Sequence, residues 1–108
     1  MTRKFVYWSP FLSACKIMGL NDTALQTMEN ALLINPTAGA IVEGTGGACK
    51  VRIKLAGRGK SAGGRVIYFD TGTEIHFLMI YPKSAQSDLT PAQKELLHNA
   101  TRNIRKEH

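Results

Sequence analysis

Apolar and basic residues alternate without exception over residues 50–55, which read K-V-R-I-K-L. Side chains along a strand point in turn to its two faces, so this pattern predicts a strand with one apolar face and one cationic face. The cationic face carries Lys50, Arg52 and Lys54.

Aromatic and β-branched residues between turn-forming segments predict the other strands. These strands are expected over residues 3–8, 65–69 and 74–81. Apolar residues that recur every three or four positions predict three helices. The helices are expected from Ser9 to Gly19, from about Asn21 to Asn35, and from Thr90 into the C-terminal residues.

Capping residues support the starts of these helices. Ser9 stands directly before a proline and is the expected N-cap of the first helix. Thr23 and Gln26 have the spacing of a capping box at the start of the second. Thr90 and Gln93 repeat that spacing at the third.

The elements follow one another in the order β-α-α-β-β-β-α. This order predicts an α+β fold, an antiparallel β-sheet with helices packed on one face. A chain of 108 residues is long enough for one hydrophobic core and too short for two, so we expect a single domain over residues 1–108. The sequence G-T-G-G at residues 44–47 is expected to be a flexible entry into the strand-rich second half.

The net charge of +6 comes from one segment. Six basic residues and no acidic residue lie between Gly44 and Phe69, and the rest of the chain is balanced, with eight basic and eight acidic residues. The six are Lys50, Arg52, Lys54, Arg58, Lys60 and Arg65. A solvated face normally mixes both signs of charge, so this focused excess favours a site for a polyanion, RNA or DNA.

Other kinds of site are disfavoured. The sequence G-R-G-K-S at residues 57–61 lacks the first glycine of a phosphate-binding P-loop and leads into a strand instead of a helix. A metal-dependent nuclease needs clustered carboxylates, which the sequence does not provide, so we expect no metal and no other cofactor. His76 has no second ligand at useful spacing and is interpreted as a structural histidine.

Cys15 and Cys49 have no His or Cys at metal-ligand spacing and are interpreted as reduced thiols. No apolar run approaches the roughly 20 residues that cross a bilayer, and the N-terminus lacks the pattern of a signal peptide. We therefore expect a cytoplasmic protein with no membrane partner.

Several segments resemble the RelE/HigB family of toxins from type II toxin–antitoxin systems. The resemblance begins with A-L-L-I-N-P-T-A-G-A-I-V-E-G-T-G-G at residues 31–47 and continues through residues 50–55. Its most specific part is G-R-G-K-S-A-G-G-R-V-I-Y at residues 57–68, and it resumes with Y-P-K at 81–83 and D-L-T-P-A at 88–92. The resemblance implies a ribosome-dependent endoribonuclease that cleaves mRNA and an antitoxin partner, often with a helix-turn-helix domain.

Carried over by position, the resemblance assigns four basic residues to the site, Arg52, Lys54, Arg65 and Lys83. Together with Tyr81, which is singled out by its place at the end of a strand, these are the expected catalytic residues. The other cations of the basic segment, Lys50, Arg58 and Lys60, are expected to bind RNA. The chain departs from the family at Ser84, where typical RelE members have an arginine, and it has no tyrosine near Thr90.

These residues suit a cleavage in which a ribose 2′-hydroxyl attacks the neighbouring phosphate without a metal. Arg52 and Arg65 would hold the charged phosphate, and Lys54, crowded by like charges, is the candidate general base. Tyr81 ends a strand, and its hydroxyl is expected to have a polar or solvated partner. In the reaction, the Tyr81 ring would stack on a base or its hydroxyl would transfer a proton.

Two other functions remain open. A non-catalytic RNA-binding or ribosome-binding module would use the same cationic strand. A ParE-like toxin directed at gyrase would stop DNA replication instead of translation.

Overall fold

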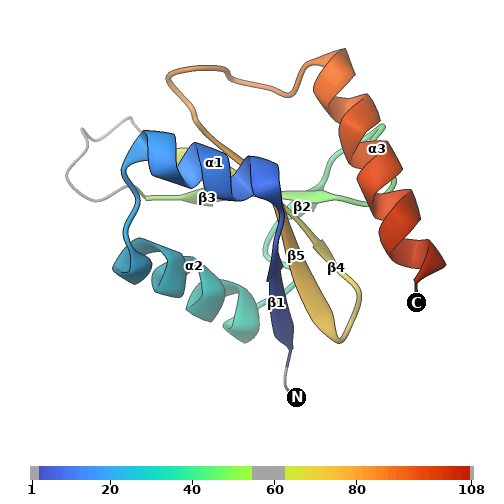
Figure 1. The fold of residues 1–108 in the computed structure, drawn as a ribbon, viewed down its shortest axis with the longest axis horizontal. Coiled ribbons are helices and arrows are strands. Elements are labelled where there is room, and N and C mark those ends of the chain that lie inside the picture. The colour runs from blue at the N-terminus through green and yellow to red at the C-terminus, as the bar shows by residue number, and fades with distance from the viewer. Residues whose placement is uncertain (1–2, 55–62, 108) are drawn as a thin grey trace.

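The computed structural model describes residues 3–54 and 63–107, which form five strands and three helices (Figure 1). The strands are β1 (Lys4–Tyr7), β2 (Ala40–Ile41), β3 (Cys49–Ile53), β4 (Gly64–Asp70) and β5 (Glu74–Pro82). The helices are α1 (Ser9–Met18), α2 (Asp22–Ile34) and α3 (Pro91–Lys106). The α+β class is confirmed. The sequence did not predict β2, because a strand of two residues is too short to show an alternating pattern.

The sheet is mixed, so the expectation of a wholly antiparallel sheet is wrong. Its strand order is β1-β5-β4-β3-β2. The last four strands pair antiparallel, whereas β1 runs parallel to β5 and pairs Lys4 with Glu74 through Tyr7 with Phe77. The first and last strands of the chain thus lie side by side, a long-range pairing that no local pattern encodes.

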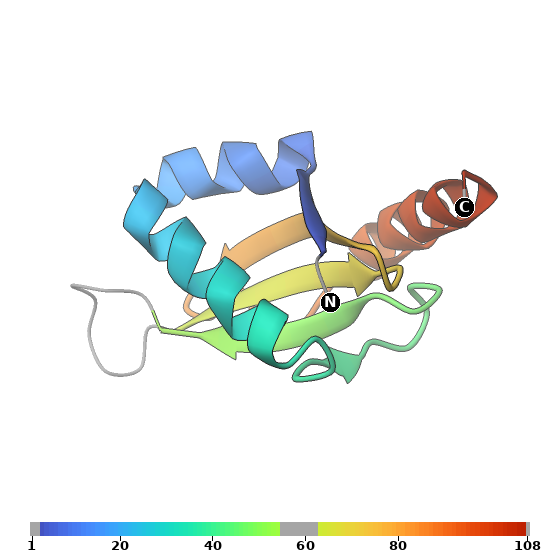
Figure 2. The same cartoon turned by 90° about the horizontal axis from the view of Figure 1, so that it is seen from below.

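Helices cover both faces of the sheet, which corrects the expectation of a single covered face (Figures 1 and 2). Phe11 of α1 and Met28 of α2 pack in one core with Val66 and other residues of β4 and β5. Leu97 and Ile104 of α3 pack in a second core on the opposite face. The reason is visible in β4, where residues 64–69 are all buried, because a strand that is apolar on both faces needs cover on both.

Two helix ends agree with the sequence-based expectations. Thr90 and Gln93 form the capping box that starts α3, with Gln93 N–H donating to Thr90 Oγ1 over 3.1 Å. Gly19 ends α1 in the left-handed conformation, at φ 71°. α3 therefore begins at a defined position directly after the segment that follows β5.

Two N-caps differ from expectation by one or two residues. Trp8, not Ser9, occupies the N-cap of α1, and its side chain makes no capping bond. Asn21, not Thr23, caps α2 by accepting a hydrogen bond from the Ala24 N–H at 2.9 Å. At α2 three small polar residues stand side by side over residues 21–23, so spacing alone did not identify the cap.

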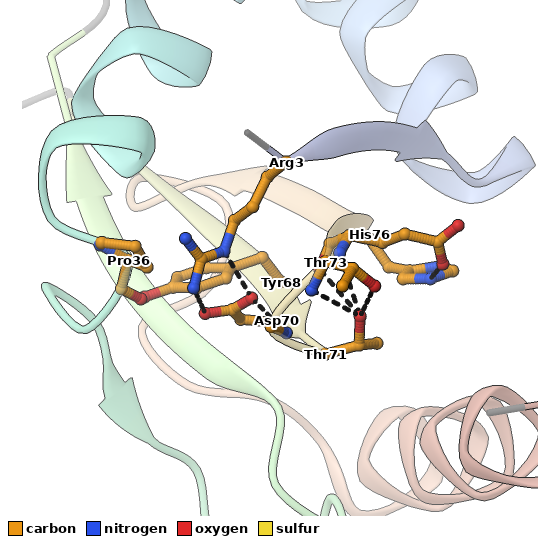
Figure 3. A network of polar contacts seen from close by, with 9 residues as sticks. Arg3, Pro36, Tyr68, Asp70, Thr71, Thr73 and His76 are labelled. Carbon is orange, nitrogen blue, oxygen red and sulfur yellow. Dashed lines mark hydrogen bonds and ion pairs between the residues drawn. The ribbon is translucent and has the colours of Figure 1, made fainter. Parts of the chain in front are cut away.

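The Asp70 end of β4 is joined to its surroundings by polar contacts (Figure 3). Arg3 donates two hydrogen bonds to the Asp70 carboxylate, at 2.9 and 3.1 Å. The Tyr68 hydroxyl donates to the Pro36 carbonyl at 2.8 Å and accepts from the Gly39 N–H at 2.9 Å. These bonds join β4 to the N-terminal segment and to the segment between α2 and β2.

The segment over residues 44–47 packs tightly against α3, so the expectation of a flexible entry is wrong. Thr45 and Thr101 are fully buried, and the Thr101 hydroxyl donates to the Thr45 carbonyl at 2.9 Å. A Cβ atom on Gly46 would lie 2.5 Å from that hydroxyl oxygen. Glycine at this position allows α3 to approach the sheet closely.

Candidate nucleic-acid interface

Three of the five residues expected to be catalytic form one row across three adjacent strands. Arg52 of β3 lies directly opposite Arg65 of β4 in the register, and Arg65 lies opposite Tyr81 of β5. Neighbouring strands are about 5 Å apart, so the row brings two guanidinium groups and a phenol onto one small area of the sheet. We call Arg52, Arg65 and Tyr81 the cross-strand row.

A β-bulge places Tyr81 in this row. Ile67 pairs with Met79 but Tyr68 pairs with Phe77, so Leu78 is an extra residue on β5. Phe77 packs on the α1 and α2 side, whereas both Leu78 and Tyr81 pack in the core on the α3 side. With strict alternation Tyr81 would point to the same face as Phe77, away from Arg65. The extra residue moves Tyr81 to the opposite face, where Arg65 lies.

The three expected lysines of the described chain lie around the row. Lys50 is two residues before Arg52 on β3 and shares its face. Lys83 follows β5, and its backbone N–H donates to the Gly63 carbonyl at 2.9 Å, directly before the start of β4. Lys54 is exposed and directly follows β3. Arg58 and Lys60, expected to bind RNA, lie outside the described residues.

Arg65 is a buried cation, with 9% of its surface exposed. Its Nη1 donates to the Gly64 carbonyl at 3.2 Å. Within the described ranges no carboxylate lies at ion-pair distance from Arg65 or Arg52. Like charges directly opposite each other on paired strands destabilise a sheet, and a buried charge needs a partner, so this pair is suited to an anionic ligand.

Gly63 leaves space beside the two arginines. A Cβ atom there would lie 3.7 Å from Arg65 Nη1 and 3.9 Å from the Cγ atom of Arg52. It would also lie 3.0 Å from the Ile53 carbonyl, closer than a side chain normally packs. Glycine therefore keeps a side chain out of the space between the two strands next to the cations.

The Tyr81 hydroxyl is buried and has no hydrogen-bond partner within the described chain, so the expectation of a polar or solvated partner is wrong. Burial raises the pKa of Tyr81, the nearby Arg65 charge lowers it, and the Asp88 charge raises it. An unpaired buried hydroxyl costs about 1–3 kcal/mol. Such a group is a candidate for a functional contact instead of a structural one.

Asp88 was not among the residues that the sequence singled out. Its carboxylate Oδ1 lies 3.5 Å from the Lys50 Nζ, and it is the one acid of the described residues that forms an ion pair with a cation of this surface. The available signal was its place in the D-L-T-P-A segment that follows β5. Asp88 lies 38 residues after Lys50 in the sequence, so only the fold could bring the two together.

His76 is a structural histidine, as expected. Its Nδ1 accepts a hydrogen bond from the Trp8 Nε1–H at 3.0 Å, and its Nε2 lies 2.9 Å from a carboxylate oxygen of Glu74. Because Nδ1 accepts a hydrogen bond, Nε2 carries the ring proton and donates a hydrogen bond to the Glu74 carboxylate. These contacts position the ring beside α1, and it is not part of the cross-strand row.

Both cysteines are free thiols, as expected. Burial raises the pKa of Cys15 to about 11 and also raises the pKa of Cys49. The thiolate is the nucleophilic form, so neither side chain is activated for covalent catalysis.

Residues 3–54 and 63–107 contain no group of three or more His, Cys, Asp or Glu side chains arranged to hold a metal ion. No helix in that part of the chain is long and apolar enough to cross a membrane.

Comparison with known proteins finds one family match. The sequence model described as the RelE toxin of the RelE / RelB toxin-antitoxin system matches residues 14–107. The match includes β3, β4, β5 and α3, and therefore every residue of the cross-strand row.

Proposed function

This chain belongs to the RelE toxin family, the toxins of toxin–antitoxin systems, and on that basis we propose that it is a ribosome-dependent endoribonuclease that cleaves mRNA without a metal ion. The observation that carries the proposal is the pair of arginines at the centre of the cross-strand row. Arg65 is buried without a carboxylate partner in the described chain, and Arg52 lies directly opposite it. An RNA phosphate supplies the negative charge that this pair lacks.

In the proposed reaction the 2′-hydroxyl oxygen attacks the adjacent phosphorus, and the bond from phosphorus to the 5′-oxygen breaks. The products are a 2′,3′-cyclic phosphate and a free 5′-hydroxyl. One protein group accepts the 2′-hydroxyl proton, and another donates a proton to the leaving 5′-oxygen. Arg65 and Arg52 bind the phosphate oxygens on which negative charge increases in the transition state.

The lysines and Tyr81 supply the remaining roles. Lys54, exposed directly after β3, accepts the proton in its neutral form, and Lys83, on the other side of Gly63, donates a proton to the leaving oxygen. Tyr81 hydrogen-bonds the substrate through the hydroxyl that has no partner within the described chain. Lys50, together with Arg58 and Lys60, binds flanking phosphates.

The ribosome has a defined part in this proposal. The described chain offers no His or carboxylate pair at the row, so its acid–base groups are weak. A scaffold that orients the reacting 2′-hydroxyl against the phosphate contributes about 7 kcal/mol or more in well-aligned systems. The ribosome would supply that orientation, which predicts slow cleavage of free RNA and fast cleavage of translated mRNA.

The family implies a cognate antitoxin. We propose that this antitoxin carries a helix-turn-helix domain and presents an acidic segment to the cross-strand row, because charge complementarity selects the partner and its orientation. The toxin then acts in the cytoplasm, where the ribosomes are. Co-expression of the antitoxin should restore growth, and an antitoxin without acidic residues in its contact segment would contradict this part.

The test is primer extension on an mRNA that is being translated, with wild-type protein and with Arg65→Ala. Removing one preorganised donor to the transition state lowers a cleavage rate by about 100- to 1,000-fold, so cleavage by Arg65→Ala should be at least about 100-fold slower. Arg102→Ala is the matched control, because Arg102 is exposed on α3 and hydrogen-bonds Asn99. It should cleave at the wild-type rate.

The same experiment separates the alternatives. A non-catalytic RNA-binding module would leave translated messages intact while Arg65→Ala weakened RNA binding. A gyrase-directed toxin would stop the uptake of labelled thymidine before that of labelled methionine. Intact messages in growth-arrested cells would overturn the nuclease proposal.

A further inference from the structure

Asp88 is the one acid of the described chain that is paired with a cation of the proposed RNA-binding surface. The Asp88 side chain is 81% exposed and the Lys50 side chain 30% exposed, and the carboxylate lies 3.5 Å from the ammonium. An ion pair this long and this exposed contributes at most about 1 kcal/mol to stability. The contact is therefore easily exchanged for another anion.

The backbone around Asp88 is well anchored. Its carbonyl accepts a hydrogen bond from the Gln86 Nε2 at 2.9 Å, and the neighbouring Leu89 is buried in the same core as Tyr81. The capping box of Thr90 and Gln93 follows directly. The segment thus holds the Asp88 carboxylate beside Lys50 through contacts that do not involve the carboxylate itself.

We propose that the Asp88 carboxylate is an internal competitor for RNA: it holds Lys50 until a backbone phosphate replaces it. This inference rests on the proposed function, because it takes the RNA-binding surface as given and assigns it a residue that limits its affinity. The carboxylate has one negative charge and reaches one lysine. An RNA strand presents several phosphates to Lys50, Arg52 and Arg65 together, so it displaces Asp88 where a single small anion does not.

The test is a double-mutant cycle on RNA affinity. The probe is a single-stranded RNA with 2′-O-methyl groups, which binds but cannot be cleaved. Asp88→Asn should lower the Kd by about two- to fivefold more than the control does, the range that an exposed ion pair supports. In a Lys50→Met background this excess should disappear, because the competitor no longer has a cation to hold.

Glu95→Gln is the control for net charge. Glu95 is an exposed acid on α3, seven residues after Asp88, and forms no ion pair within the described chain. Both substitutions remove one negative charge, so both tighten binding through the overall field of the protein. The competition is measured by how much more Asp88→Asn lowers the Kd than Glu95→Gln does. This difference should shrink as the KCl concentration rises.

Equal effects of Asp88→Asn and Glu95→Gln overturn the inference, and so does an excess that persists with Lys50→Met. Arg65→Ala separates this failure from failure of the proposed function. If Arg65→Ala weakens RNA binding but Asp88→Asn shows no excess, the surface binds RNA and Asp88 does not compete. If Arg65→Ala binds as tightly as the wild type, the surface itself is wrong and both proposals fall.

Discussion

The two ends of β4 each have an arginine at the sheet, and the two arginines have opposite surroundings. At the Asp70 end, Arg3 makes two hydrogen bonds to one carboxylate (Figure 3). At the other end, Arg65 is buried beside Arg52 with no carboxylate at ion-pair distance in the described chain. The first end satisfies its charges internally, and the second requires an anion from outside.

The difference shows where the fold is stabilised and where it is arranged for binding. Helix α3 also packs near the Asp70 end. The Arg105 guanidinium lies 4.9 Å from the centre of the Phe69 ring, and the Thr101 hydroxyl donates a hydrogen bond to the Thr45 carbonyl. The Arg65 end concentrates like charges and the unpaired Tyr81 hydroxyl. Sites that destabilise the isolated protein in this way are typical of ligand contacts.

Gly46→Ala should produce the largest loss of stability. A Cβ atom at Gly46 would lie 2.5 Å from the Thr101 hydroxyl, and the residue has φ 73°. The left-handed backbone and the contact with α3 together should lower the free energy of unfolding by about 3 kcal/mol, measured by urea denaturation.

Gly19→Ala is the matched control for that prediction. Gly19 has φ 71°, but nothing lies within 4 Å of its Cβ position. Its substitution should cost about 1 kcal/mol, from the backbone alone. If the two variants are equally stable, α3 is not closely packed on this segment, and the contrast between the two ends of β4 is weaker than we describe.

Asp70→Asn and Arg65→Met compare the two arginines directly. Asp70→Asn removes the charged partner of Arg3 and should lower the free energy of unfolding by about 2 kcal/mol, with an unchanged rate of mRNA cleavage by the folded protein. Arg65→Met removes a buried charge without a carboxylate partner, so stability should be unchanged or higher, by up to about 1 kcal/mol, while cleavage is lost.

Thermal unfolding and primer extension on the same preparations measure both properties. A large loss of stability in Arg65→Met would mean that Arg65 is a structural residue like Arg3. The two ends of β4 would then not differ in role.

Tyr81→Phe should raise stability and should lower cleavage less than the substitutions of Arg65 do. It removes a buried hydroxyl that has no partner within the described chain, so the free energy of unfolding should rise by about 1 kcal/mol. Cleavage of translated mRNA should fall by about tenfold, the effect of one lost hydrogen bond to the substrate. A variant that is both more stable and fully active would remove Tyr81 from the proposed site.

Local patterns predicted much of the fold and part of the site. The alternation over residues 50–55 correctly assigned Lys50 and Arg52 to one face of β3, because strand geometry turns successive side chains to opposite sides. The capping box at Thr90 and the left-handed Gly19 were also correct. Each of these depends only on residues a few positions apart.

Apart from the two N-caps, the errors concern contacts between distant residues. The parallel pairing of β1 with β5 joins the first and last strands of the chain, through residues about 70 positions apart in the sequence such as Lys4 and Glu74. Thr101 was expected on no apolar stripe, yet it is fully buried because Thr45 accepts its hydrogen bond. On the same helix Leu97 and Ile104 pack against the sheet, whereas the neighbouring Leu96 is 65% exposed.

By itself, the sequence determined the helices and most of the strands, the focused positive charge and the resemblance to a toxin family, since all four are properties of neighbouring residues or of composition. The tertiary structure alone decided that α3 covers the second face, that the bulge at Leu78 turns Tyr81 towards Arg65, and that Asp88 reaches Lys50. Register and packing depend on the free energy of contacts between remote segments, and no local pattern contains that information.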